Sequence, residues 1–168
     1  MWEGRLASGT RRQAPRGPED FVVSVEVNPA PGLSTEKPVG VARMLRDRGV
    51  DVVNIADGPR ATVRMSNTAL GEAVARDVGS EAIIHVCCRD RNLLGLMSDL
   101  LGSHTRGLHN LVIITGDPPK MGDYPKATAV FDLDSIGLLK LVTGLNSGVD
   151  PAGREFGGQS HFFAATGA

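Results

Sequence analysis

One pattern recurs along the chain and limits the folds that it can adopt. A short apolar segment ends in a polar residue, a loop follows, and then comes an amphipathic segment with helical spacing. The apolar segments are rich in β-branched residues and are apolar on both faces, which is typical of parallel strands. Strands are predicted at residues 21–27, 51–56, 82–88, 111–115 and 160–165. Their alternation with helices predicts an α/β fold, a parallel sheet with helices packed outside it.

The segments between the strands carry signals for the ends of helices. Gly49 suits the left-handed residue that closes a helix, and Asn92 can cap one by accepting a backbone N–H. Helices are predicted at 38–48, from Ser66 or Asn67 to 75, from 92 to about 103, and from Asp132 or Asp134 to 144 or 145. The third helix is apolar on more than one face, which indicates a layer between the sheet and other structure, or a subunit contact.

The first four strands begin roughly 30 residues apart, a spacing that fits both a (β/α)8 TIM barrel and a doubly wound sheet. Two observations favour the barrel. No G-x-G-x-x-G turn follows the first strand, and polar residues end every strand rather than only those at one switch point. Because a whole barrel usually needs about 250 residues, the sequence predicts an incomplete one, with about the first five strands and four helices.

The chain divides into two parts on this interpretation. Residues 1–20 are rich in Arg, Gly and Pro and are predicted to be a flexible leader or linker, and residues 21–168 form the partial barrel. A partial barrel would expose strand edges and an uncovered inner face, which would favour a homo-oligomer. No apolar segment has the length of a membrane span or a secretory signal, so a cytoplasmic location is the default expectation.

Composition excludes some functions. A net charge of -1 and 4% aromatic residues argue against a nucleic-acid partner. Cys87 and Cys88 are adjacent, which suits neither a disulfide framework nor a zinc site, so no metal is expected. Walker A and nucleophile motifs are absent, and Lys120 alone is a weak sign of phosphate binding.

Four polar residues at strand ends are candidates for chemistry: Glu26, Asp57, His85 and Asp117. For Glu26 a function is favoured over a structural ion pair, since a charge inside an apolar strand is costly. His85 is as compatible with a satisfied core histidine as with a site residue. The local patterns of Asp57 before Gly-Pro and Asp117 before Pro-Pro favour turn formation. Together the residues predict a carboxylate-lined mouth suited to proton transfer and a small organic ligand, with the reaction class open.

Two basic residues, Arg89 and Arg91, follow the third strand directly. They are expected to be solvated charges or contacts for an anion. Strand alternation would put Asp117 on the same face as Thr115 and Ile113.

Several motifs together resemble the methylenetetrahydrofolate reductase family. They are "SVEVNPAPG", "VNIADGPRATVRMS", "IHVCCRDRNL", "ITGDPPKMGDYPKATAVFDLDSIGLL" and "FFAATGA", and they occur in order from about residue 21 to 168. The sequence is most similar to the reductase half of bifunctional homocysteine S-methyltransferase/methylenetetrahydrofolate reductase proteins. An upstream homocysteine methyltransferase domain would accord with that resemblance.

The resemblance implies a TIM barrel that binds FAD at the carboxyl ends of its strands. Such an enzyme uses NADH or NADPH to reduce 5,10-methylenetetrahydrofolate to 5-methyltetrahydrofolate, in one-carbon and methionine metabolism. Glu26 matches the general acid for opening of the folate ring, and Asp117 matches the aspartate beside flavin and folate. Cofactor-binding positions match His85, Thr115, Gly116, Asp117, Ala129, Phe131 and Asp132.

The sequence departs from the family at two positions: Ala56 lacks a hydroxyl that some members present to the flavin, and Thr115 replaces a larger residue. If the second half of the barrel is missing, weak FAD binding without turnover is expected. Two other hypotheses stay open. One is a pterin-binding barrel that transfers a methyl group without flavin, and the other is a non-catalytic half-barrel that acts as an interaction module.

Overall fold

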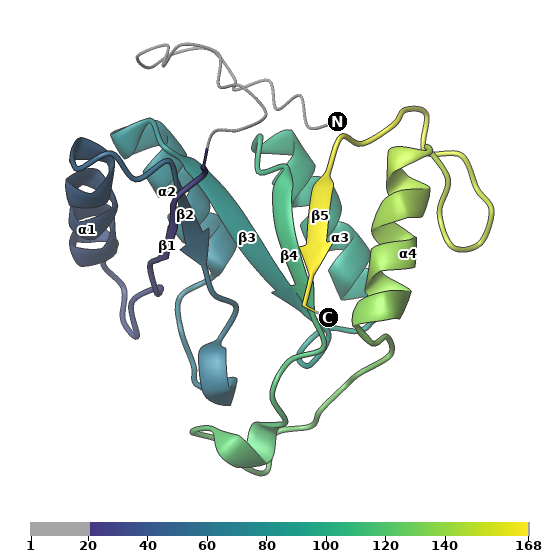
Figure 1. Cartoon of the computed structure of the whole chain (residues 1–168). Helices are drawn as coiled ribbons and strands as arrows, with labels where there is room; N and C mark the ends of the chain where they lie inside the picture. Colours follow the sequence, from purple (N-terminus) through teal and green to yellow (C-terminus); the bar gives the residue numbers. More distant parts are fainter. Residues whose placement is uncertain (1–20, 168) are drawn as a thin grey trace.

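Five parallel strands alternate with four α-helices in a computed structural model of the chain, which describes residues 21–167 (Figure 1). The strands are β1 (Ser24–Glu26), β2 (Val52–Ile55), β3 (Glu81–Cys87), β4 (Asn110–Ile114) and β5 (Phe163–Thr166). The helices are α1 (Glu36–Asp47), α2 (Asn67–Val78), α3 (Leu93–Thr105) and α4 (Ser135–Asn146), with short 3-10 turns η1 (Pro59–Ala61) and η2 (Pro119–Met121). The predicted leader, residues 1–20, lies outside the described residues.

The order of the strands across the sheet is β1-β2-β3-β4-β5, the same as their order in the chain. Every neighbouring pair is parallel, with Ser24 opposite Val52 and Ile83 opposite Asn110, for example. A doubly wound sheet reverses its strand order at a switch point, and this sheet does not. The described residues therefore form part of a (β/α)8 barrel, which confirms the fold class that the sequence predicted.

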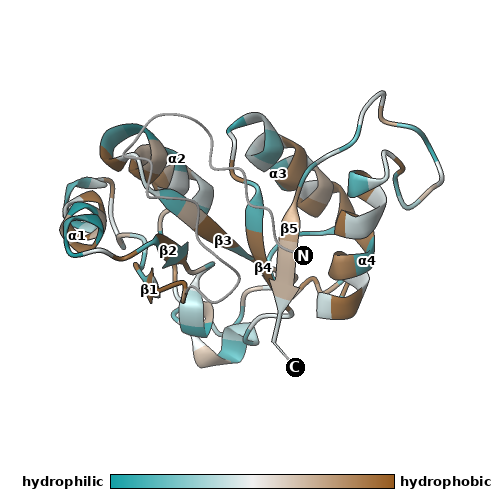
Figure 2. Cartoon of the chain, turned by 45° about the horizontal axis from the view of Figure 1, so that its top comes forward, coloured by the Kyte–Doolittle hydropathy of each residue, from teal (hydrophilic) through white to brown (hydrophobic). Residues whose placement is uncertain are grey.

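The two faces of the sheet differ in burial. Side chains that face the helices are almost completely buried, and they form one hydrophobic core with the helices; examples are Val53, Ile55, Ile84 and Ile113. The alternate residues lie on the opposite, inner face, where Ile83, His85 and Val112 are only partly buried although Cys87 at the end of β3 is fully buried. In Figure 1, α2 and α3 lie behind the sheet while α1 and α4 flank it. Figure 2 shows hydrophobic residues concentrated in the central strands and along α4.

Local capping explains where the helices begin. The side chains of Asn92 and Asp134 accept hydrogen bonds from the backbone N–H groups of Gly95 and Gly137, at 2.9 Å and 2.7 Å, so both predicted caps are confirmed. Ser66 precedes α2, but its side chain makes no capping bond.

Several helix boundaries differ from the prediction by one to three residues, most clearly the start of α1 and the end of α2. Helix α1 begins at Glu36 rather than at Pro38, because proline is tolerated anywhere in the first turn, where its missing N–H has no intrahelical partner. Helix α2 continues to Val78 and ends where Gly79 adopts a left-handed φ of 67°.

Helix α3 presents apolar residues to the core and to solvent. Leu96 and Leu100 are buried, whereas Leu94 is 75% exposed. Among residues 21–167, no helix is long and apolar enough to cross a membrane.

Candidate functional site

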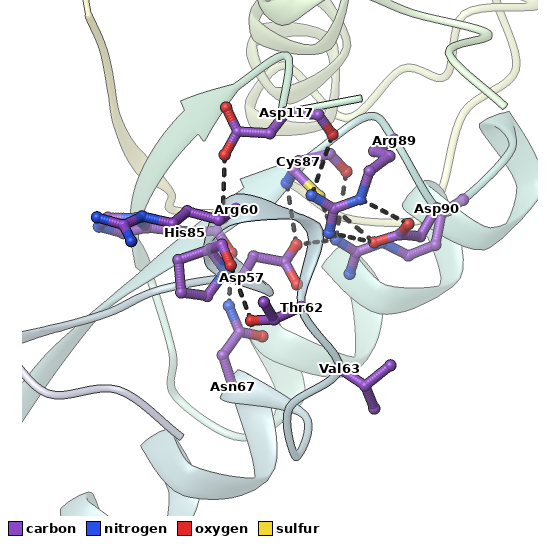
Figure 3. Close-up of polar contacts among 12 residues, drawn as sticks. Asp57, Arg60, Thr62, Val63, Asn67, His85, Cys87, Arg89, Asp90 and Asp117 are labelled. Carbon is purple, nitrogen blue, oxygen red and sulfur yellow. Dashed lines mark hydrogen bonds and ion pairs between the residues drawn. The ribbon is translucent and has the colours of Figure 1, made fainter. Parts of the chain in front are cut away.

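Polar side chains gather at the carboxyl ends of the strands, where the loops that follow β2 and β4 also lie. Those loops carry η1 and η2, which lie together below the sheet in Figure 1 and contact each other. We call this end of the sheet the mouth. Figure 3 shows the polar contacts there, with residues contributed by β3 and by the segments after β2, β3 and β4. Parallel strands deliver their carboxyl ends to one edge, which is why residues distant in sequence meet here.

Asp57 joins the ends of β2 and β3. Its Oδ2 accepts a hydrogen bond from the backbone N–H of Cys87 at 3.0 Å and forms an ion pair with the Arg91 guanidinium. Arg91 also donates to Asp99 of α3 at 2.8 Å. Asp57 does precede a turn, in which Gly58 has a left-handed φ of 54°, as the sequence suggested. Its carboxylate in addition fixes the end of β3, a role the local pattern could not reveal.

Arg89 is buried, with 4% of its surface exposed, so the expectation that it is a solvated charge is wrong. Its Nε and Nη2 donate to the carboxylate of Asp90 at 2.8 Å and 2.7 Å, and its Nη1 donates to the backbone carbonyl of Asp117 at 3.3 Å (Figure 3). The hydrogen bond from Arg89 lowers the pKa of Asp90. Arg89 is therefore a buried cation whose hydrogen bonds link Asp90 to the backbone of Asp117 and so stabilise the loops at the mouth.

Arg91 is likewise not a solvated charge, since its partners Asp57 and Asp99 hold it against the protein. Its Nε is buried and has no hydrogen-bond partner among the described residues. The run Arg-Asp-Arg looks like a hydrophilic surface in the sequence. The acidic partner of Arg89 is its neighbour Asp90, whereas Arg91 pairs with Asp57 and Asp99, and Asp57 lies far away along the chain.

His85 lies on the inner face of β3 and is partly buried. Burial lowers its pKa, while the negative charges of Glu26 and Asp57 act in the opposite direction. The imidazole is therefore predominantly neutral at pH 7, with one nitrogen able to donate and the other able to accept a hydrogen bond. Glu26 and His85 are close enough to interact electrostatically, so the structure brings these two predicted residues together.

Asn67, the first residue of α2, fixes the strands next to His85. Its side chain is buried, and Nδ2 donates to the carbonyls of His85 and Ile55 at 2.6 Å and 3.4 Å. The sequence pattern predicts Asn67 only as a possible helix cap. Nothing in the local pattern indicates that it satisfies two strand carbonyls instead.

Glu26 is the last residue of β1 and is exposed, and its Oε1 accepts a hydrogen bond from Asn28 Nδ2 at 3.1 Å. The sequence pattern predicts a charge enclosed in an apolar strand. The structure instead puts Glu26 opposite Asn54, in register with the inner face that the helices do not cover. Solvent therefore reaches this carboxylate in the described structure.

Asp117 follows Gly116, whose left-handed φ of 97° redirects the chain at the end of β4. Thr115 is exposed, and its hydroxyl accepts a hydrogen bond from the backbone N–H of Ser135, at the start of α4, at 3.1 Å. The left-handed turn at Gly116 separates Thr115 from Asp117. Asp117 is exposed at the mouth, and its Oδ2 accepts a hydrogen bond from the backbone N–H of Arg60 at 3.0 Å (Figure 3).

Three other expected cofactor residues lie farther along the same loop. Ala129 is exposed, whereas Phe131 packs partly buried against the hydrophobic core. The Asp132 carboxylate accepts a hydrogen bond from the Leu93 backbone N–H at 3.0 Å, at the start of α3. Of the predicted residues, the structure thus brings His85 and Glu26 together on the inner face and exposes Asp117 at the mouth, while the side chains of Thr115, Phe131 and Asp132 contact the helix layer.

The two cysteines do not supply a nucleophile. Both are buried and free, and burial raises the pKa of Cys87 to about 12 and also raises the pKa of Cys88. Thiols with such pKa values remain protonated and unreactive at neutral pH. Within the described part of the chain, no group of His, Cys, Asp or Glu side chains could hold a metal ion.

Parallel βα units in sequential order, with carboxylates and a neutral histidine at the carboxyl ends of the strands, define a (β/α)8-barrel protein, a class in which active sites lie at that end of the strands. The sequence model of the family described as methylenetetrahydrofolate reductase matches residues 11–152. The chain therefore belongs to the methylenetetrahydrofolate reductase family, and this membership supports a folate-related reductase function in general. No curated protein matches the chain.

Proposed function

We propose that the chain contributes the FAD- and folate-binding mouth of an enzyme that uses NADH or NADPH to reduce 5,10-methylenetetrahydrofolate to 5-methyltetrahydrofolate. The observation that carries this proposal is the state of Asp117. Its carboxylate is oriented by the Arg60 N–H and yet stays exposed at the mouth. A fixed, accessible negative charge at the end of a barrel strand suits a ligand that becomes cationic as it reacts.

The residues present fit one side of a flavin. The ring system of a flavin has two flat faces and an edge of alternating hydrogen-bond donors and acceptors. The inner face of β3 and β4 offers the partly buried Ile83 and Val112 for a flat face, and His85 and Asp117 offer polar groups for the edge. When bound, FAD would transfer two electrons from NADH or NADPH to the folate.

Glu26 is the proposed general acid. When the five-membered ring of 5,10-methylenetetrahydrofolate opens, one C–N bond breaks and its electron pair stays on the nitrogen. Glu26 would donate a proton to that nitrogen and leave a cationic iminium group on the other. Because Glu26 is exposed in the described structure, a bound ligand would have to exclude water from it for efficient transfer.

Asp117 would stabilise the iminium cation through its negative charge. The bond from Arg60 fixes the carboxylate before the substrate arrives, so less reorganisation is needed during the reaction. His85, being mostly neutral at pH 7, would bind by hydrogen bonding and would add no positive charge that opposes the cation.

Titration of the purified chain with FAD, followed by visible absorbance and flavin fluorescence, tests the proposal. We expect weak but saturable binding, which Asp117→Ala weakens further and which Asp47→Ala, on the exposed face of α1, leaves unchanged. Anaerobic mixing with NADH or NADPH and 5,10-methylenetetrahydrofolate then tests formation of 5-methyltetrahydrofolate. Folate binding without flavin binding would instead favour a methyl-transfer barrel, and a stable assembly that binds neither would favour an interaction module.

A further inference from the structure

The loops that follow β2 and β4 are fastened to each other at two points. The Arg60 N–H donates to Asp117 Oδ2, and the Val63 N–H donates to Asp123 Oδ2, both at 3.0 Å. We call the two contacting segments, residues 58–63 and 117–123, the clasp. In both bonds a carboxylate of the second segment accepts from a backbone N–H of the first, so the contact depends on the backbone conformation of residues 58–63.

That backbone conformation is unusual. Arg60 and Ala61 are consecutive non-glycine residues with left-handed φ angles of 57° and 56°. Residues other than glycine keep such angles only when the surrounding structure holds them there. The amide of Arg60 is bonded to Asp117, and the amide of Val63, two residues after Ala61, is bonded to Asp123. The strained turn is therefore held from both sides by carboxylates of the other loop.

Gly122 lets the two segments approach closely. A Cβ at this position would lie 1.9 Å from the carbonyl oxygen of Ala61, a distance that no side chain permits. Backbone thus packs directly on backbone between the two bonds. Any larger residue at position 122 would push the segments apart.

The buried side chain of Arg89 contacts both segments of the clasp. Its Nη1 donates to the Asp117 carbonyl at 3.3 Å, and its Nη2 would lie 2.8 Å from a Cβ at Gly58, so the guanidinium packs against both segments. Of the side chains that hold the clasp together, Arg89 is buried and Asp123 is exposed. Asp123 can be replaced without disturbing the core.

We propose that the clasp is a positioning device for Asp117 and that Asp123 is its positioning residue, an inference that rests on the proposed function of Asp117. The bond from Val63 to Asp123 holds the strained turn in place, and the turn in its place aims the Arg60 N–H at Asp117. Loss of the Asp123 bond lets the turn relax, and Asp117 then loses the donor that orients it.

A flavin-free measurement tests the coupling directly. Amide hydrogen exchange followed by NMR reports on the Arg60 and Val63 N–H groups separately. In Asp123→Asn, whose weaker acceptor carries no charge, we expect both amides to exchange about tenfold faster. Asp47→Asn, an exposed aspartate of α1, is the matched control and leaves both rates unchanged. Faster exchange at Val63 with an unchanged rate at Arg60 would overturn the coupling.

Gly122→Ala opens the clasp without changing a carboxylate. The same acceleration at both amides is expected, whereas Gly158→Ala is the control, because a Cβ at Gly158 meets no atom within 4 Å. Unchanged exchange in Gly122→Ala would also overturn the proposal. Circular dichroism of each variant verifies that the sheet and helices are intact.

Measurements on the bound flavin distinguish an effect on the position of Asp117 from a general loss of stability. We expect Asp123→Asn to weaken FAD affinity about tenfold and to shift the visible spectrum of the bound flavin, with a thermal midpoint close to that of Asp47→Asn. Faster exchange of the Arg60 and Val63 amides, with an unchanged FAD affinity and an unchanged flavin spectrum, would show that the clasp does not position Asp117. If the unmodified chain bound no FAD, the proposed function would fail, while the exchange data would still decide whether the clasp orients Asp117.

Discussion

Asp57 illustrates how a residue with a turn-forming pattern can stabilise a whole edge of the sheet. Its carboxylate accepts from the backbone of Cys87 and pairs with Arg91, and both charged groups are largely removed from water. Removing one partner of such a pair leaves the other charge without compensation. The stability of the mouth therefore depends on charges that the sequence alone would assign to a loop and a surface.

Asp57→Ala should lower the free energy of unfolding by about 3 kcal/mol, because Arg91 would stay partly buried without this partner. Urea denaturation followed by circular dichroism measures the change. Asp47→Ala provides the comparison, since the Arg46–Asp47 pair is exposed and its loss should cost less than about 0.5 kcal/mol. Equal losses in the two variants would contradict the structural role of Asp57.

Glu26→Gln tests the proposed acid in an enzyme preparation that binds FAD. Reduction of the flavin by NADH or NADPH should continue, because no proton from Glu26 is needed for it. The folate half-reaction should slow by roughly 100-fold, the typical loss when a general acid is removed. Stopped-flow absorbance separates the two half-reactions, and an equal loss in both would argue for a structural effect instead.

For individual residues, the sequence predicted which end of the sheet they occupy better than it predicted which residues they contact. Glu26, His85 and Asp117 could be assigned to one end of the sheet, because parallel strands bring their carboxyl ends together. The burial of Arg89 and the bond from Arg60 to Asp117 could not be predicted. Both depend on the close approach of two loops without any hydrophobic periodicity.

Among the secondary-structure elements, α3 has a side-chain cap and α2 lacks one. Asn92 accepts from Gly95 at 2.9 Å, whereas Ser66 makes no capping bond. Asn92→Ala should therefore cost about 1 kcal/mol of stability, the usual value for a lost cap. Ser66→Ala should cost less than about 0.5 kcal/mol. Thermal denaturation of the two variants measures the difference, and a larger loss for Ser66→Ala would show that the assignment of caps is reversed.

Three histidines from different elements meet at the opposite end of the sheet. His104 lies in the last turn of α3, His109 precedes β4 and His161 precedes β5, and the ring centroid of His104 lies 4.9 Å and 6.0 Å from the other two. Burial lowers the pKa of His104, with a further decrease from the neighbouring histidines. The folded chain thus binds fewer protons here than the unfolded chain does.

The sign of that shift makes stability fall with decreasing pH. The contribution of His104 is present above the unfolded pKa of about 6.5 and is lost as the pH falls below it. Thermal midpoints between pH 7.5 and pH 5.5 should decrease, and His104→Gln should make the decrease smaller. His85 also has a lowered pKa and keeps its own share in that variant. An unchanged slope in His104→Gln would exclude the histidine group as a cause.

Elements with strong periodicity could be predicted from sequence, whereas the contacts between the irregular ones could not. The five strands and four helices match the predicted segments with small shifts at their ends. The sequence predicted turns after Asp57 and Asp117, where η1 and η2 lie, but it did not predict that the two turns contact each other. Apolar patterns report burial against a core, and these turns have no buried residues.

At the scale of the whole molecule, the buried cysteines report on opening of the sheet. Cys87 and Cys88 are inaccessible and protonated at neutral pH, so a thiol reagent should react slowly with the native chain. Their labelling should accelerate with urea in parallel with the loss of circular dichroism. Rapid labelling without denaturant would show that β3 separates from its neighbours locally, before the chain unfolds.

The sequential strand order has a consequence for how the chain is made. Each of β2, β3 and β4 pairs with the strand of the preceding βα unit, so it finds its partner in a segment that the ribosome has just released. Only β5 must wait for a longer stretch, which contains η2, α4 and the loop after it. Domains tend to fold from the amino terminus during synthesis, and short separations between partners speed pairing. A nascent chain arrested at a point where α4 has left the ribosome should already resist protease across β2 to β4, because both segments of the clasp would then also lie outside the ribosome.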